Sequence, residues 1–325
     1  MKIRLSRLVL LVLAFSSAGA CFAQEPPQSF PQRPVRVFVP YSPGGGTDVL
    51  ARIAAQELHN GLGQPFIVEN KPGADGILAA ELVKRAAPDG YTLLVAPSGV
   101  LVMNAVLKKA LPYSPQADFV PISVVGRLPL MITVKESLPV KSVKELVDYA
   151  NSKTNDVTYA SSSALFQLAT ELFKQKTGTN FLRIPYKSSA DSVVALVSGQ
   201  VTLAIADIPP ISSLIQDNKL RALAYTDHRR NALFPDVPTV AEAGFPGTEI
   251  ATLVGFVAPK GTPDLIVRKI QDVLIKAAQK PEVRARLINL GIEPVGSTSE
   301  EFATAIKFDT DRLEEVARRA GIEKQ

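Results

Sequence analysis

The chain has few of the residues on which catalytic and metal sites depend. Its 325 residues include one cysteine, two histidines and no tryptophan. The cysteine, Cys21, lies near the N-terminus, so no later segment can supply a disulfide, a thiol nucleophile or a thiolate metal ligand. His59 and His228 belong to no zinc-binding spacing, and we expect both to be solvated and the protein to hold no metal.

Motifs for nucleophilic catalysis and for nucleotide binding are also missing. The sequence contains neither a G-x-S-x-G nucleophile turn nor a G-x-x-x-x-G-K-[ST] phosphate loop. Val49 stands where the dinucleotide fingerprint G-x-G-x-x-G requires its third glycine. We therefore predict a protein with no catalytic residues and no cofactor.

The N-terminus has the form of a secretory signal peptide. Basic Lys2, Arg4 and Arg7 precede the apolar run 8–15, and small residues follow up to Ala23. We predict residues 1–23 as a signal peptide cleaved after Ala23, and hence a periplasmic protein; lipidation at Cys21 is the alternative. No later run is long enough to span a bilayer.

Charge does not indicate a nucleic-acid partner. The formal net charge is +5, and removal of residues 1–23 leaves 33 basic against 31 acidic residues, or +2. The basic residues are scattered among acidic ones rather than gathered in a stripe. We therefore expect no nucleic-acid binding.

Apolar strands alternate with helical segments along most of the chain, which is typical of α/β folds with a parallel sheet covered on both faces. The first series contains strands at 35–39, 66–69 and 91–96 and helices at 48–62 and 77–87. Two apolar segments, 119–125 and 130–134, interrupt the rhythm. A second series of strands lies at 157–160, 181–184, 201–206 and 220–225, with helices at 143–152, 165–177, 189–198 and 210–217. A strand at 254–258 and helices at 264–279, 282–289 and 300–320 complete the chain.

Two α/β series joined by crossing segments predict two lobes with a ligand cleft between them. We expect residues 24–128 plus 226–325 to form lobe 1 and residues 129–225 to form lobe 2, with the crossing segments as a hinge. In open parallel sheets, ligands lie outside the carboxyl ends of the strands. The corresponding turns here are rich in glycine, serine and asparagine, which supply hydrogen bonds and close backbone approach.

The turn Tyr41–Asp48 carries three consecutive glycines between a strand and a helix. We expect Thr47 or Asp48 to cap this helix. Exposed N–H groups and the helix dipole would favour a carboxylate or phosphate at Gly44, Gly45 and Gly46. The alternative is a turn with a purely structural role.

Three further turns contribute candidate ligand contacts, and each has an alternative role that involves no ligand. Ser161, Ser162 and Ser163 either face the cleft or only cap a helix. Lys187, beside Ser188 and Ser189, either pairs with an anionic ligand or is a solvated charge. Asp207 either accepts a hydrogen bond from a ligand amine or hydroxyl, or caps the helix that begins near Pro210.

Eight segments in order along the chain resemble the Bug-type receptors, the extracytoplasmic solute-binding subunits of tripartite tricarboxylate transporters. They are residues 34–48 (PVRVFVPYSPGGGTD), 68–73 (VENKPG), 87–94 (APDGYTLL), 143–146 (VKEL), 185–187 (PYK), 220–223 (LRAL), 235–244 (PDVPTVAEAG) and 258–263 (APKGTP). The resemblance implies a two-lobed fold of the periplasmic binding protein type II kind. It also implies a small acid as ligand, such as a dicarboxylate, an amino acid or an aromatic carboxylate, and membrane transporter subunits as partners. We expect a monomer.

In that family the loop matching Tyr41–Asp48 holds the ligand's carboxylate, and the loops matching Ser161–Ser163, Tyr186–Ser189 and Asp207 complete the site. The chain departs from the family pattern at Gln167, where Ser163–Phe166 is about two residues shorter, at Ser188 and at Leu253, so no particular ligand carries over. The predicted ligand-binding residues are Tyr41, Pro43, Gly44, Gly45, Gly46, Thr47, Asp48, Ser98, Ser161, Ser162, Ser163, Gln167, Lys187, Ser188, Ser189 and Asp207. Two alternative functions are a sensing subunit for a membrane signalling partner and a secreted enzyme acting on a small acid.

Overall fold

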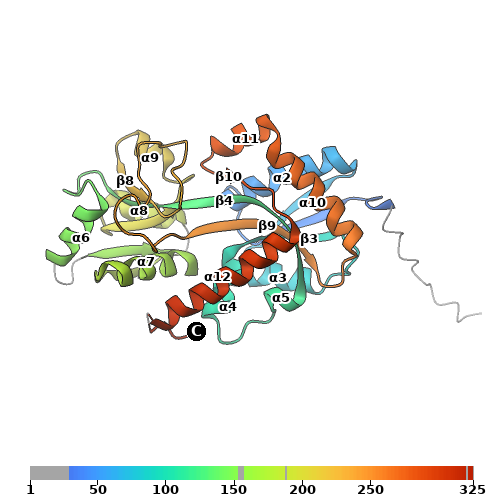
Figure 1. Ribbon diagram of the computed structural model, residues 1–325, viewed down its shortest axis with the longest axis horizontal. Helices are drawn as coiled ribbons and strands as arrows, with labels where there is room; N and C mark the ends of the chain where they lie inside the picture. Colours follow the sequence, from blue (N-terminus) through green and yellow to red (C-terminus); the bar gives the residue numbers. More distant parts are fainter. Residues whose placement is uncertain (1–28, 153–156, 187–188, 320, 325) are drawn as a thin grey trace, which may run out of the picture.

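The computed structural model describes residues 29–152, 157–186, 189–319 and 321–324. The predicted signal peptide and Cys21 lie outside the described residues, as do Lys187 and Ser188. Two lobes lie side by side (Figure 1). The first lobe begins with β1 (Val35–Val39), α2 (Gly46–Leu62), β2 (Phe66–Asn70), η2 (Ala74–Gly76), α3 (Ile77–Lys84), β3 (Thr92–Pro97), η3 (Gly99–Met103), α4 (Asn104–Leu107) and α5 (Pro115–Asp118).

A long strand, β4 (Phe119–Lys135), leads into the second lobe. That lobe contains α6 (Val143–Ser152), β5 (Thr158–Ser161), α7 (Ala164–Thr177), β6 (Leu182–Pro185), α8 (Ser189–Ser198), β7 (Leu203–Asp207), α9 (Ser212–Gln216) and β8 (Leu220–Tyr225). The chain returns through β9 (Ala251–Pro259) to α10 (Asp264–Gln279), α11 (Pro281–Ile288), β10 (Glu293–Pro294) and α12 (Ser299–Arg319). The mixed α/β fold with two lobes confirms the predicted fold class.

The strands form one mixed sheet in the order β2-β1-β3-β9-β4-β7-β5-β6, with β8 and β10 paired to β4. The predicted parallel pairing holds for β2-β1-β3 and for β7-β5-β6. It is wrong for β8, which belongs to the second series and pairs antiparallel with β4. β4, β9 and β10, for which no direction was predicted, also form antiparallel pairs. The two apolar segments expected at 119–125 and 130–134 are one strand that serves both lobes. β4 pairs with β9 as far as Pro129 and with β7 from Leu130 onward.

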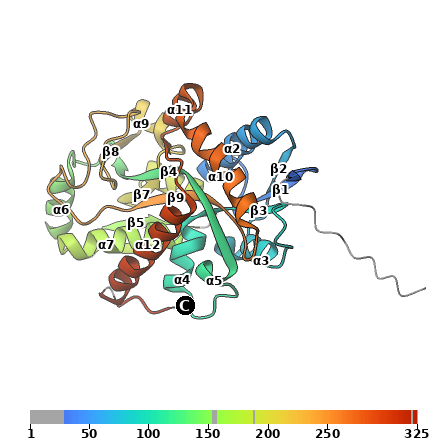
Figure 2. The same cartoon turned by 45° about the vertical axis from the view of Figure 1, so that its right-hand side comes forward.

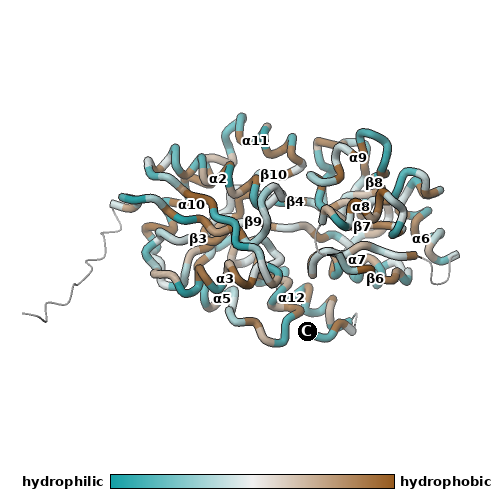
Figure 3. Tube along the Cα trace, turned by 180° about the vertical axis from the view of Figure 1, so that it is seen from behind, coloured by the Kyte–Doolittle hydropathy of each residue, from teal (hydrophilic) through white to brown (hydrophobic). Residues whose placement is uncertain are grey.

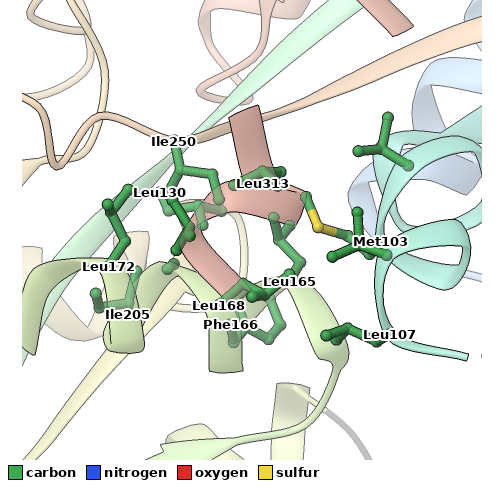
Figure 4. Close-up of a cluster of buried hydrophobic side chains, with 14 of the residues drawn as sticks. Met103, Leu107, Leu130, Leu165, Phe166, Leu168, Leu172, Ile205, Ile250 and Leu313 are labelled. Carbon is green, nitrogen blue, oxygen red and sulfur yellow. The ribbon is translucent and has the colours of Figure 1, made fainter. Parts of the chain in front are cut away.

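Buried apolar side chains form a continuous core from one lobe to the other. Hydrophobic stretches follow the strands and the inner parts of the helices, while hydrophilic residues are frequent at the outer turns (Figure 3). One buried cluster joins Met103 and Leu107 of the first lobe to Leu165 and Phe166 on α7 and Leu313 on α12 (Figure 4). The lobes therefore contact one another through packed side chains as well as through the crossing strands.

The last helix, α12, lies across both lobes rather than returning to the first lobe alone, as Figures 1 and 2 show. It contacts α4 and η3 of the first lobe and α7 of the second. Its Phe302 is packed over Gly255 of β9, where a Cβ atom would lie 2.4 Å from Phe302 Cε1 and 2.7 Å from the Ser123 carbonyl oxygen. In the described part of the chain, no helix is long and apolar enough to cross a membrane.

Candidate ligand-binding site

The glycine-rich turn leads directly into α2, and the helix begins earlier than the sequence predicted. Gly45 is the N-cap and Gly46 is the first helical residue, so the expected cap at Thr47 or Asp48 is wrong. No side chain caps the helix, and its first backbone bond runs from Val49 N–H to Gly45 O at 3.0 Å. Within the described residues no acceptor contacts the N–H groups of Gly45, Gly46 or Thr47, and a helix start with free N–H groups is a favourable place for an anion.

Asp48 holds the glycine turn in place. Its carboxylate accepts hydrogen bonds from Gly44 N–H at 3.0 Å, from Arg52 Nε at 3.1 Å and from Asn70 Nδ2 at 2.9 Å. Burial by itself would raise the pKa of Asp48, but these hydrogen bonds and the Arg52 charge outweigh it, and the pKa is lowered. Gly44 needs its positive φ of 89° for this turn, and its N–H is already used.

Tyr41 lies at the base of the turn with its hydroxyl against η3. A Cβ atom on Gly99 would come within 2.6 Å of the Tyr41 hydroxyl, so glycine allows this approach. Burial raises the pKa of Tyr41, and the negative charges of Asp75 and Asp207 add to that effect. One acid from each lobe therefore acts on the Tyr41 hydroxyl, which stays neutral.

Asp207 ends β7, where it pairs in register with Leu130 of β4. Its carboxyl group has no hydrogen-bond or ion-pair partner among the described residues. Burial raises its pKa from 3.8 to about 6. A partly exposed, unpaired carboxyl between the lobes is chemically able to accept a hydrogen bond from a ligand or, when protonated, to donate one.

A cavity of about 200 Å³ lies between the lobes. Four of the predicted residues line it, namely Ser161, Ser162, Ser163 and Gln167. Ser163 is the N-cap of α7 and its side chain makes no capping bond, while the Ser161 hydroxyl donates to Ser163 O at 3.2 Å. The cavity therefore has the open first turn of α7 in its wall.

The other predicted residues lie outside the cavity lining. Tyr41 to Asp48 form the separate turn described above; Pro43 there is exposed. The Ser98 hydroxyl accepts a hydrogen bond from Leu253 N–H at 3.0 Å and so joins η3 to β9. Ser189 begins α8, and its hydroxyl is buried without a hydrogen-bond partner in the part of the chain described.

The remaining lining residues were not among those predicted from the sequence. They are Asp75, Leu107, Lys108, Ala164, Arg183, Tyr186, Ile322 and Glu323. They come from η2, α4, α7, β6 and the C-terminal tail, so only the folded chain brings them together. Asp75 and Tyr186 carried a signal, because both fall in predicted strand-end turns. Among the described residues, no group of three or more His, Cys, Asp or Glu side chains is placed to hold a metal ion.

Comparison with known proteins agrees with this architecture. Residues 50–322 match the family model described as tripartite tricarboxylate transporter family receptor. Protein BugT of Bordetella pertussis is 33% identical over 320 residues, which is 98% of each chain.

Two solved structures from Rhodopseudomonas palustris are also similar to the chain. Rpa4515 with adipate is 35% identical with a TM-score of 0.84, covering 90% of this chain and 99% of that one. MatC with bound malate is 32% identical with a TM-score of 0.79, covering 88% and 99%. With a family match over most of its length and full-length relatives above 30% identity, the chain belongs to the tripartite tricarboxylate transporter receptor family of solute-binding proteins.

Proposed function

We propose that this protein captures a small organic acid between its two lobes and presents it to the membrane subunits of a tripartite transporter. The ligand classes that fit are dicarboxylates, amino acids and aromatic carboxylates. The structures of Rpa4515 with adipate and MatC with malate support a carboxylate ligand for this chain as well. In this proposal the protein binds without chemical conversion and acts as a monomer.

The observation that carries the proposal is the cavity between the lobes, whose wall includes the first turn of α7. Ser163 and Ala164 bring uncapped backbone N–H groups to that wall. The start of α2 at Gly45–Thr47, outside the cavity lining, supplies a second such set. Each start favours negative charge through its N–H groups and the helix dipole. A volume of about 200 Å³ is below the usual range for drug-sized ligands and suits a small metabolite.

The proposed site joins the turn 41–47 and Ser98 of one lobe to Ser161–Ser163, Gln167, Ser189 and Asp207 of the other, with Lys187 and Ser188 as further candidates. Asp48 belongs to it as the residue that orients Gly44, not as a direct contact. We propose residues 24–128 plus 226–325 and residues 129–225 as the units that close on the ligand about β4 and β9. Closure about a hinge is a common response of two-lobed binding proteins.

We further propose that the protein works in the periplasm after cleavage behind Ala23. The basic start, the short apolar run and the small residues that follow support this processing. A mature protein whose intact mass begins at Gln24 is the expected result. A diacylglycerol-bearing mass at Cys21 would instead establish the lipidated alternative.

A sensing role for a membrane partner and a secreted enzyme are the alternatives. Co-purification with large and small membrane transporter subunits would favour transport over sensing. An enzyme would consume the bound acid, whereas a receptor releases it unchanged, which mass spectrometry of the ligand after incubation decides.

The proposal is tested by thermal denaturation of residues 24–325 with a panel of small acids. A ligand that binds only the folded state at a hundredfold excess over Kd stabilises it by about 2.7 kcal/mol, which raises Tm by about 4 °C in a protein of this length. Neutral amides of the same acids are the matched controls and should leave Tm unchanged. A panel in which no acid raises Tm, while ligands of another class do, would contradict the proposal.

A further inference from the structure

Four charged side chains in the described part of the chain line the cavity, and only two of them pair with each other. Lys108 and Asp75, both from the first lobe, form an ion pair with 3.0 Å between Nζ and Oδ2. Arg183 and Glu323 have no oppositely charged atom within ion-pair distance among the described residues. The Lys108 charge is thus compensated, and Arg183 is the cation of the cavity that lacks an anion.

The surroundings of Arg183 explain why no acid of the second lobe pairs with it. Arg183 lies on β6 directly opposite Tyr159 of β5. The nearby carboxylate of Glu171 on α7 already accepts the Tyr159 hydroxyl at 2.9 Å and the Lys174 ammonium at 2.9 Å. The Nε atom of Arg183 is buried and has no hydrogen-bond partner among the residues that the structure describes. A ligand in the cavity cannot reach this shielded atom, but it can pair with the guanidinium charge, which has no anion beside it in the described part of the chain.

The position of Arg183 also sets its separation, along the strand direction, from the first turn of α7. Its register partner Tyr159 stands two residues before Ser161 on β5, which corresponds to about 7 Å along the strand. The first turn of α7, at Ser163 and Ala164, lies beyond Ser161 in the same cavity wall. Two places that favour an anion therefore lie in one small cavity, separated along the strand direction.

We propose that Arg183 binds the second acid group of the ligand and so makes this receptor selective for diacids over monoacids. One carboxylate would lie at the helix-start N–H groups and the other against the guanidinium, whose planar fork matches a carboxylate in a bidentate arrangement. This inference rests on the proposed function, because it presumes an acid in the cavity. Arg183 is then a specificity-determining residue of the binding site.

The test is calorimetric titration of residues 24–325 with adipate and with hexanoate, which has the same chain length and a single acid group. The variants are Arg183→Gln and Arg183→Lys, and Lys144→Gln on the exposed face of α6 is the control for the loss of one positive charge from the same lobe. We expect Arg183→Gln to weaken adipate binding about 10- to 100-fold and to leave hexanoate binding within twofold. Arg183→Lys should retain part of the affinity for adipate, and Lys144→Gln should match the wild type.

Each other outcome has a defined meaning. If the wild type binds adipate and hexanoate equally well and Arg183→Gln alters neither affinity, the inference is overturned while the proposed function stands. If Arg183→Gln weakens both acids equally, the residue supports the site without reading the second acid group, which also overturns the inference. If the wild type binds neither of these acids nor succinate, glutarate and their monoacid counterparts, the proposed function and the inference fail together. Thermal unfolding of each variant separates loss of folding from loss of binding, and Arg183→Lys keeps the test decisive if Arg183→Gln does not fold.

Discussion

Replacing Asp207 by asparagine removes an ionisable group from between the lobes while keeping the shape of the side chain. Burial raises the pKa of Asp207 from 3.8 to about 6, so the folded protein favours the neutral acid. The neutral form therefore contributes stability that is fully present below about pH 3.8 and is lost as the pH rises through about 6. A shift of this size corresponds to about 3 kcal/mol, and because Asp207 keeps some contact with solvent we expect about 2 kcal/mol.

The expected result is that Asp207→Asn is about 2 kcal/mol more stable than the wild type at pH 7.5 and about equal to it at pH 4. Urea unfolding at the two pH values measures both differences. Asp148→Asn on α6, where the side chain is 61% exposed, controls for the loss of one negative charge. An equal stability difference at both pH values would refute the reasoning, because it would mean that burial does not perturb Asp207.

Three more substitutions follow from the same contacts. No atom lies within 4 Å of a Cβ at Gly45, so Gly45→Val should fold normally. It should weaken acid binding at least tenfold in calorimetry, with Gly45→Ala intermediate, and wild-type affinity in the valine variant would exclude this turn from the site. Gly255→Ala forces a Cβ atom into the Phe302 ring and should lower the free energy of unfolding, measured in urea, by about 2 kcal/mol. An unchanged free energy of unfolding would mean that α12 shifts freely over β9. Glu323→Gln removes a negative charge from the cavity wall and should tighten diacid binding by about 0.2–1 kcal/mol; weaker binding would show that Glu323 assists the ligand.

Local patterns in the sequence predicted most of the elements because their signals are short-range. The strand Val35–Val39 and the helices Val143–Ser152, Ser189–Ser198 and Asp264–Gln279 occupy the predicted residues. The antiparallel course of β4 and β9 was missed because strand direction depends on pairing between segments more than a hundred residues apart. Hydrophobic runs report burial, and burial is the same for either direction.

The candidate site was only partly predictable for a related reason. The turn at Gly44–Gly46 and the serines after β5 carry local signals, namely glycine and polar residues at strand ends. The start of α2 was misplaced by the expectation of a side-chain cap, since Asp48 reaches back to Gly44 N–H from within the helix. Arg183 lies inside a strand with no local motif, and only the approach of α4, α7 and the C-terminal tail makes it part of a cavity.

The central claim, that an acid is held between the lobes, is tested most directly by a crystal structure of residues 24–325 with the acid that raises Tm most. The account predicts one carboxylate at the N–H groups that begin α2 or α7, and the rest of the ligand within the cavity beside Ser161–Ser163. An acid bound outside the space between the lobes, or one whose carboxylate contacts neither helix start, would contradict it.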